Sequence, residues 1–319
     1  MKQWFQVTLL VLVLAATGGL LLERQAVLDW WQLRGYTAPA NVVQLATDDD
    51  MTALARHLFY VNHPDVTTGK AFTSNCPSGK EKTVVLGCYL GNDHGIYVYA
   101  VDDVRLNGVE QVTAAHEMLH AAYRRLSGGE RKRVDAMLMD YYQHGLADQR
   151  IIDTIEAYKK SEPDDVVNEM HSIFGTEITD LPAGLMQYYT QYFTDRSKVT
   201  AFTASYQGEF TSRKEQVAAY DTQLKDMKQQ IEANEASLKQ ERAAIDARRT
   251  QLDAERAVGS PSYRTDAVAF NKTVDAYNTK VAQNKNLIDQ YNDIVDKRNA
   301  VVLEEQELSQ ELSASATSE

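Results

Sequence analysis

Apolar residues recur every seven positions in the last third of the chain, in two rows separated by the triplet Gly259-Ser260-Pro261. The rows are Val217, Leu224, Ile231, Leu238, Ile245 and Leu252, then Val274, Val281, Ile288, Val295 and Val302. A seven-residue repeat predicts a coiled-coil seam, and a breaker between two similar rows predicts that the chain reverses there. We therefore expect residues 196–311 to form an antiparallel helical hairpin, with Leu252 near Val274. Two separate long helices that pair with other chains are the alternative.

The pattern before the hairpin mixes strand-like runs, turns and amphipathic helices, which is typical of a folded α+β domain over residues 41–195. Residues 83–90 and 95–101 are rich in Val, Ile and Tyr and flank the turn Gly91-Asn92-Asp93, which predicts a β-hairpin. Residues 108–126 carry apolar residues three or four apart, which predicts a helix with one buried stripe. Further helices are expected at residues 130–142, 148–160, 163–174 and 182–206, the last leading directly into the helical hairpin.

The chain begins with a membrane-directed segment. Residues 4–22 contain only three polar residues and would be about 28 Å long as a helix, close to the thickness of the hydrocarbon core. We expect residues 1–24 to be an uncleaved anchor that leaves the bulk of the chain extracytoplasmic. A signal peptide cleaved among residues 15–19, followed by secretion, is the alternative. At the other end, residues 312–319 are small and polar and are expected to be disordered.

Charge and cysteine content exclude several classes of protein. The chain has 319 residues, with 33 Lys and Arg against 45 Asp and Glu, and this acidic balance disfavours binding to the phosphates of nucleic acid. Its two cysteines, Cys76 and Cys88, are too few for a four-cysteine zinc site. Because Cys76 lies in the loop before the β-hairpin arm that holds Cys88, we expect a disulfide in an oxidising compartment. Two partly buried free thiols are the alternative.

The sequence His116-Glu117-Met118-Leu119-His120 lies within the helix predicted at residues 108–126. Histidines four positions apart lie about 40° apart around a helix, so both imidazoles can bind one metal ion. Glu117 projects from the adjoining edge, where it can accept a proton from a water held by that ion. His116 also continues the apolar stripe of the helix, so a core histidine bonded to a carbonyl is the alternative.

With this motif, residues 83–177 resemble the zincin metallopeptidases. The resemblance implies that His116 and His120 bind Zn²⁺, that Glu117 is the catalytic general base, and that the α+β domain is a small zincin-like catalytic domain. It also implies that the strand at residues 95–99 is the edge strand that aligns an extended substrate. The residues after His120 lack the glycine and the third histidine of the metzincin continuation, so the third ligand must come from farther along the chain.

The third metal ligand is therefore sought downstream. The segment Val167-Asn168-Glu169-Met170-His171 resembles the Asn-Glu element from which gluzincin-type enzymes take a glutamate ligand, which implies Glu169. Periodicity places Glu169 and His171 on opposite edges of one helical face, so both cannot bind the same ion. His171 and Glu177 remain the alternatives to Glu169. The candidate donors to the transition state are Tyr123, Tyr158, His171 and Tyr188, which the sequence does not rank.

The sequence thus predicts a membrane-anchored, extracytoplasmic zinc metallopeptidase that hydrolyses peptide bonds with a metal-activated water. Its expected partners are a protein or peptide substrate, the membrane through the N-terminal segment, and a protein that binds the coiled-coil hairpin. No nucleic acid is expected. The rival hypothesis is a non-catalytic envelope scaffold or regulator that acts through the hairpin, and the intact His-Glu-x-x-His motif argues against it.

Overall fold

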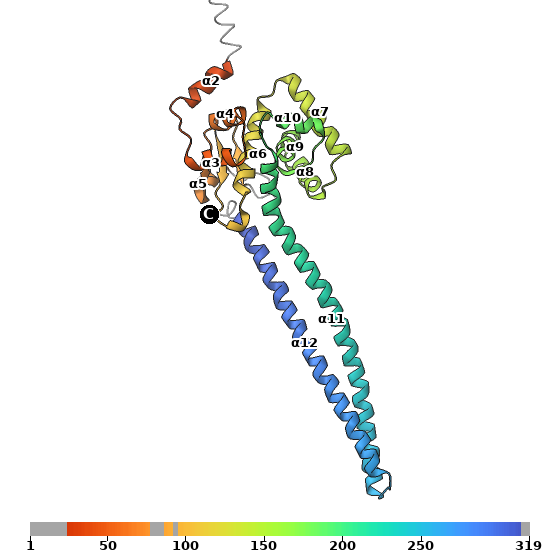
Figure 1. Cartoon of the computed structure of the whole chain (residues 1–319). Coiled ribbons are helices and arrows are strands. Elements are labelled where there is room, and N and C mark those ends of the chain that lie inside the picture. The colour runs from red at the N-terminus through yellow and green to blue at the C-terminus, as the bar shows by residue number, and fades with distance from the viewer. Residues whose placement is uncertain (1–23, 77–85, 92–94, 314–319) are drawn as a thin grey trace, which may run out of the picture. The chain divides into compact units, whose positions relative to one another are not determined.

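Figure 1 shows the computed structural model of the chain. The structure describes residues 24–76, 86–91 and 95–313. Apart from Arg24, the predicted membrane segment lies outside the described residues, as does the predicted polar tail beyond Ser313. In the part of the chain that the structure describes, no helix combines the length and the apolar character needed to cross a membrane.

The chain divides into two compact units, of which unit 1 comprises residues 1–209 and 308–319 and unit 2 comprises residues 210–307. Unit 1 is mostly helical and contains a small three-stranded sheet, so the α+β expectation holds in this coarse sense. The elements before the long helices are α2 (Arg24–Leu33), α3 (Ala40–Asp48), α4 (Ala53–Val61), β1 (Asp65–Thr67), α5 (Gly69–Asn75), β2 (Gly87–Tyr89), β3 (Ile96–Tyr99), the 3₁₀ helix Val104–Leu106, α6 (Val109–Arg124), α7 (Gly128–His144), α8 (Gln149–Ser161), α9 (Val166–Glu177) and α10 (Ala183–Tyr189).

The sheet of unit 1 has the strand order β1-β3-β2. Strand β3 pairs in parallel with β1 and antiparallel with β2, where Tyr97 lies opposite Cys88. Ile96 and Val98 of β3 are fully buried, because their side chains point to one face of the sheet and belong to the core that includes residues of α6. The predicted antiparallel pairing of β2 and β3 is therefore present, and residues 92–94 of the predicted turn lie outside the described residues. The prediction that residues 95–99 form an edge strand is wrong, and β2 is at the edge instead.

Helix α6 carries the His-Glu-x-x-His motif and packs against α9, the strands β2 and β3, and the helices α3 and α4. It begins after Gly108, whose φ of 102° lies in the left-handed region that favours glycine. It ends at Arg124, and Ser127 then starts α7 through a capping box with Glu130. The two glycines after Ser127 therefore open the second helix, whereas the sequence suggested that it begins at Glu130.

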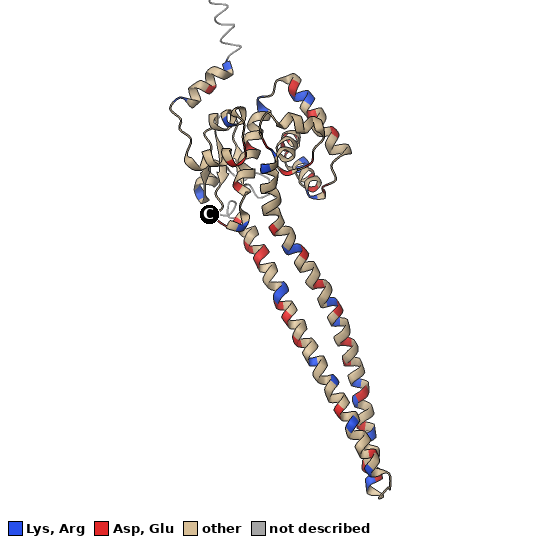
Figure 2. Cartoon of the chain, in the orientation of Figure 1, with Lys and Arg blue, Asp and Glu red and all other residues tan. Residues whose placement is uncertain are grey.

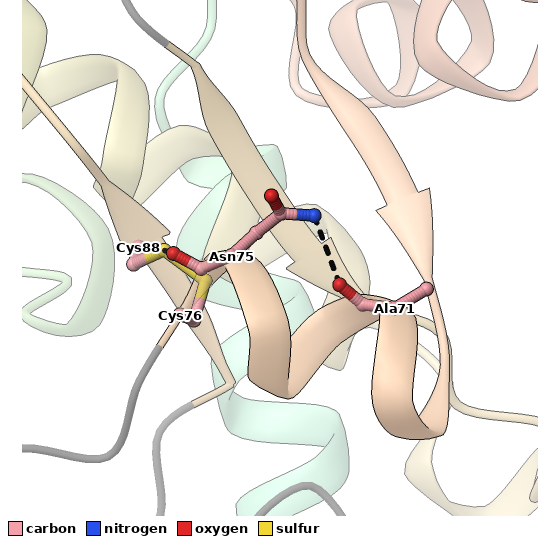
Figure 3. Close-up of a disulfide and its surroundings, with 4 residues drawn as sticks. All are labelled: Ala71, Asn75, Cys76 and Cys88. Carbon is pink, nitrogen blue, oxygen red and sulfur yellow. Dashed lines mark hydrogen bonds between the residues drawn. A yellow bond between two sulfur atoms is a disulfide. The ribbon is translucent and has the colours of Figure 1, made fainter.

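A disulfide joins Cys76, which follows α5, to Cys88 in β2, as predicted (Figure 3). The two Cα atoms are 5.8 Å apart, a usual spacing for this bond. Helix α5 ends at Asn75, whose side-chain amide donates to the carbonyl of Ala71 over 2.9 Å. The carbonyl of Asn75 itself lies 3.8 Å from Cys88 Sγ. The disulfide therefore fastens the end of α5 to the edge strand of the sheet.

The helix predicted over residues 182–206 is interrupted. Helix α10 ends at Tyr189, and α11 (Ser197–Ala257) begins only after a turn. Arg196 in that turn is buried, and its guanidinium donates to backbone carbonyls around the C-terminal end of α9, including that of Ile178. The last carbonyls of a helix have no partner within the helix, so Arg196 satisfies groups that would otherwise be buried unpaired. The prediction of one continuous helix is therefore wrong.

Helices α11 and α12 (Tyr263–Ser313) lie side by side and antiparallel, and most of their length forms the hairpin of unit 2 (Figure 1). The side chains that pair across it are Arg213 with Glu304, Asp221 with Arg298, Asn234 with Asn284, Glu241 with Lys280, and Arg248 with Asp266. Figure 2 shows charges of both signs interspersed along both helices. Because Arg248 already lies opposite Asp266, Leu252 lies nearer to the turn than Val274 does. The predicted pairing of Leu252 with Val274 is therefore wrong.

The first residues of α11 belong to unit 1. Val199, Thr200 and Thr203 are buried, and the Thr203 hydroxyl donates to the carbonyl of Thr176 in α9. The division between the units therefore falls after Glu209, whereas the sequence placed the start of the hairpin at residue 196. Helix α11 thus belongs to unit 1 up to Glu209 and to the hairpin after it. The amino-acid composition of α11 does not change at that point, so the sequence does not reveal it.

Candidate metal centre

Two packed helices bring the predicted metal ligands together. Helix α6 carries His116 and His120, and α9 carries Glu169. The helices approach closely at Gly175 of α9, where an added Cβ would lie 2.4 Å from Cδ1 of Leu119. As a result, one ring nitrogen of each histidine and one carboxylate oxygen of Glu169 lie within 4.8 Å of one another.

The distances within this group suit a shared ion. His116 Nε2 lies 3.6 Å from Glu169 Oε2, and His120 Nε2 lies 3.4 Å from Glu169 Oε1. Both separations exceed the usual hydrogen-bond length of about 2.9 Å. Two ligand atoms on one tetrahedral zinc ion lie about 3.3 Å apart, given metal–ligand bonds of about 2.0 Å. Glu169 Oε2 is buried and has no hydrogen-bond partner among the described residues. The three side chains therefore fit a bound metal ion.

The donor atoms also restrict which metal fits. Both cysteines are joined in the disulfide, so the group offers two imidazole nitrogens and a carboxylate and no thiolate. Two histidines and one glutamate are a usual ligand set of catalytic zinc, which keeps a fourth position for water or substrate. All three side chains are largely buried, with 17% of His116, 10% of His120 and 9% of Glu169 exposed. The residues present therefore fit a divalent metal ion, and Zn²⁺ is among those that such a ligand set binds.

Glu117 lies beside the ligands and against the edge strand β2. The backbone N–H of Tyr89 in β2 donates to its carboxylate. An added Cβ at Gly87 would lie 3.0 Å from Oε1 of Glu117 and 2.4 Å from Cγ2 of Thr113, so only glycine leaves room for this approach. The strand therefore holds the carboxylate in place, and Gly87 is the one residue in the sequence that signals this contact.

Burial and neighbouring charges shift the pKa values of these groups. Burial alone would lower the pKa of His116, but the contact with Glu169 and the charge of Glu117 raise it to about 9. Burial raises the pKa of Glu117, and the two histidines offset this only in part. Burial would also raise the pKa of Glu169, yet His120, His116 and a hydrogen bond from Tyr158 lower it. The pKa values of the two carboxylates thus move in opposite directions, which suits one ligand and one proton acceptor.

The two alternative third ligands lie elsewhere. His171 is fully buried among tyrosine rings, and its Nε2 lies 2.9 Å from the hydroxyl of Tyr188. Burial lowers the pKa of His171 to about 3. The carboxylate of Glu177 accepts from Arg150 over 2.6 Å and from Gln207 over 3.3 Å. Of the three candidates, only Glu169 joins the two motif histidines in a group that could hold an ion.

The candidate centre lies in a cavity of about 650 Å³. Strand β2 contributes Gly87 and Tyr89 to its wall, the α6–α7 side contributes Arg124 and Arg131, and the α8–α9 side contributes Tyr158, Glu162 and Asp165. A cavity of this size lies within the usual range of ligand-binding pockets. Sequence reasoning missed the arginines and the two outer carboxylates. Arg124 ends α6, Arg131 lies on α7, and Glu162 and Asp165 lie in the turn between α8 and α9.

The four candidate donors to the transition state differ in their position relative to the cavity and in their hydrogen bonds. His171 and Tyr188 bond to each other in the interior and do not line the cavity. The hydroxyl of Tyr123 donates to Asp135, which is not one of the candidate ligands, over 2.7 Å. The hydroxyl of Tyr158 lies beside Glu169 and within the cavity.

Comparison with protein-family models, with curated proteins and with solved structures finds no match to this chain.

Proposed function

We propose that this chain is a membrane-anchored, extracytoplasmic zinc-dependent peptidase of the zincin class. The observation that carries the proposal is the convergence of His116, His120 and Glu169 within 4.8 Å, beside Glu117 and in one cavity. His116, His120 and Glu169 would hold a zinc ion, which would supply a water of lowered pKa and polarise the carbonyl of a peptide bond. The remaining steps are the work of side chains and backbone groups of this chain.

Glu117 is the proposed general base and acid. Its carboxylate accepts the proton that the attacking water loses and delivers it to the nitrogen of the leaving amine. The hydrogen bond from Tyr89 N–H supports this role, because it fixes the carboxylate beside the ligands while leaving its other lone pairs available. Replacing Glu117 by glutamine keeps the shape of the side chain and removes the proton acceptor.

The substrate is proposed to lie extended along β2. Leu90 N donates to Gly95 O and Tyr99 N donates to Leu86 O, so alternate residues of β2 pair with β3. Gly87 and Tyr89 therefore turn their backbone groups away from β3, on the edge that lines the cavity. An exposed strand edge can bind a peptide through main-chain hydrogen bonds. The Tyr89 carbonyl and the backbone groups of Gly87 are the proposed contacts, since Tyr89 N–H is used by Glu117.

Tyr158 is the proposed donor to the oxyanion that develops on the attacked carbonyl. Its O–H donates to Glu169 in this structure and would turn to that oxygen when Glu169 binds the ion. It is the candidate whose hydroxyl is both in the cavity and beside a metal ligand. Removing one donor of this kind from an acyl-transfer site costs about 10²–10³ in kcat. Tyr158→Phe should therefore lower kcat by that factor while zinc binding is retained.

The test is cleavage of a peptide library by the full chain in detergent, read by mass spectrometry. We expect cleavage by the wild type, loss of cleavage on chelation and its return with added zinc. Glu117→Gln should retain zinc and lose about 10²–10⁴ of the activity, since general-base catalysis contributes that much. His120→Ala should lose both zinc and activity.

Two matched controls separate local from general effects. His144 is an exposed histidine on α7, and Glu235 is an exposed carboxylate on the hairpin. His144→Ala and Glu235→Gln should behave as the wild type in both assays. If the wild type and Glu117→Gln both bind about one zinc per chain and neither cleaves any peptide, the rival hypothesis of a non-catalytic envelope scaffold is favoured.

A further inference from the structure

Helix α2 exposes a cluster of large apolar side chains. The exposed fractions are 44% for Val27, 43% for Leu28, 60% for Trp30 and 69% for Trp31. With about 100° between successive residues of a helix, these four side chains share one side of α2. Exposed tryptophans grouped with aliphatic residues mark a surface that binds something apolar. We refer to Val27, Leu28, Trp30 and Trp31 as the α2 patch.

The opposite side of α2 is fastened to unit 1. Asp29 is only 5% exposed and accepts two hydrogen bonds from Arg125, of 2.8 and 2.9 Å, one to each carboxylate oxygen. His57 Nε2 of α4 lies 2.8 Å from the same carboxylate, and Gln25 donates to it over 3.0 Å. A bidentate, buried ion pair fixes the rotation of the helix about its axis. The α2 patch is therefore held facing away from the unit.

The charges around the patch complement a phospholipid surface. Arg24 and Arg34, at the two ends of α2, are exposed, and the Arg34 guanidinium lies 5.4 Å from the ring centre of Trp30. The one acidic residue within α2, Asp29, is neutralised by its partners on the other side. Trp with flanking Arg is typical of the zone between lipid headgroups and acyl chains.

The α2 patch lies close in sequence to the predicted membrane segment. The apolar run ends at Leu22, and α2 begins two residues later at Arg24. Two residues span at most about 7 Å. The headgroup zone on each side of the hydrocarbon core is about 5–7 Å thick. If residues 4–22 cross the membrane, the first turn of α2 must start in or beside that zone.

We propose that α2 docks on the surface of the phospholipid bilayer, with Val27, Leu28, Trp30 and Trp31 at the level of the headgroups and the upper acyl chains. The Asp29–Arg125 pair connects the docked helix to the residue that follows the C-terminal end of α6, the helix of the metal ligands. The inference rests on the anchoring part of the proposed function and is independent of its peptidase part. It adds that the catalytic unit is fastened to the membrane surface and does not hang from a free linker.

The test uses tryptophan fluorescence of the full chain in vesicles of phosphatidylcholine and phosphatidylglycerol. The chain has three tryptophans, so Trp4→Phe leaves only the two of the α2 patch. Quenching by a nitroxide near the headgroup end of the acyl chain is compared with a nitroxide near its methyl end and with aqueous iodide. The control carries Val104→Trp with all three native tryptophans changed to Phe. Val104 is 86% exposed and precedes the start of α6, about 24 Å from the end that contacts α2.

We expect blue-shifted emission from the α2 patch, several-fold stronger quenching by the shallow nitroxide than by the deep one, and several-fold weaker quenching by iodide than for the control. Iodide quenching equal to that of the control would overturn the proposal, because the patch would then face water. Protection from iodide and from both nitroxides would also overturn it, because a protein, such as a second copy, would then cover the patch. If carbonate extracts the chain from the vesicles, the chain is not anchored in the membrane. That result refutes both the anchor and the docking of α2. Peptide cleavage in detergent tests the peptidase part separately.

Discussion

Replacing Gly87 by alanine should push strand β2 away from helix α6. An added Cβ would lie 2.4 Å from Thr113 Cγ2 and 3.0 Å from both Cγ and Oε1 of Glu117. Favourable carbon–carbon contact begins at about 3.5 Å, so the strand or the helix must move by roughly 1 Å. Overpacking of this kind costs about 1–3 kcal/mol of the free energy of unfolding. The same movement takes Tyr89 N–H away from Glu117, so the rate of peptide cleavage should fall as well.

A double-mutant cycle measures this effect. Thr113→Ala removes the closest of the clashing atoms, so Gly87→Ala should cost about 1 kcal/mol less in that background. The free energy of opening is read from hydrogen exchange of the α6 amides at increasing urea. Gly128→Ala is the matched control, because an added Cβ there meets nothing within 4 Å. An equal cost of Gly87→Ala in both backgrounds would refute the close packing of Gly87 on Thr113.

Three further predictions concern stability. Reducing the Cys76–Cys88 bond should lower the free energy of unfolding of unit 1 by about 3 kcal/mol, since it opens a loop with a sequence separation of 12. Thermal unfolding with and without reductant measures this. Asn284 is buried and accepts a hydrogen bond from Asn234 over 3.0 Å, so Asn284→Ala should destabilise the hairpin by about 1 kcal/mol. Leucine at both positions should instead raise the melting temperature of the hairpin. Circular dichroism measures both effects. Burial would raise the pKa of Asp29, but its hydrogen-bonded partners outweigh burial and hold the pKa below its ordinary value of 3.8. The stabilisation by Asp29 is therefore present above that value and lost as the pH falls through the folded pKa, so the cost of Asp29→Asn should shrink towards zero in acid unfolding curves.

The long elements of this fold were predictable because their signals are repeated. The seven-residue rows recur along both arms, so the existence and direction of the hairpin follow from the sequence. The pairing near the turn does not follow, because every heptad presents the same apolar face and the register depends on particular pairs such as Asn234 with Asn284. Strand β1 has only three residues, too few to show an alternating pattern, and its partner β3 is distant in the sequence. The sequence therefore does not predict it.

The same contrast applies to the candidate site. His116, Glu117 and His120 belong to one helical motif, so their juxtaposition is local and could be predicted. Glu169 comes from another helix, and its place depends on the close contact of α9 with α6. The hydrogen bond from Tyr89 to Glu117 involves a backbone group, which leaves no trace in the choice of amino acid. Local chemistry was therefore predictable and the resemblance implied Glu169, whereas the contact of β2 with Glu117 could not be predicted.

X-ray absorption at the zinc edge of the freshly purified, chelator-free chain tests the central claim most directly. We predict about one zinc per chain, bound by two imidazole nitrogens and carboxylate oxygen at about 2.0–2.2 Å. Glu169→Ala should remove the carboxylate ligand or the ion itself, and His171→Ala should leave the spectrum unchanged. A chain without zinc, or a spectrum with three imidazoles that loses one in His171→Ala, would contradict the centre formed by His116, His120 and Glu169.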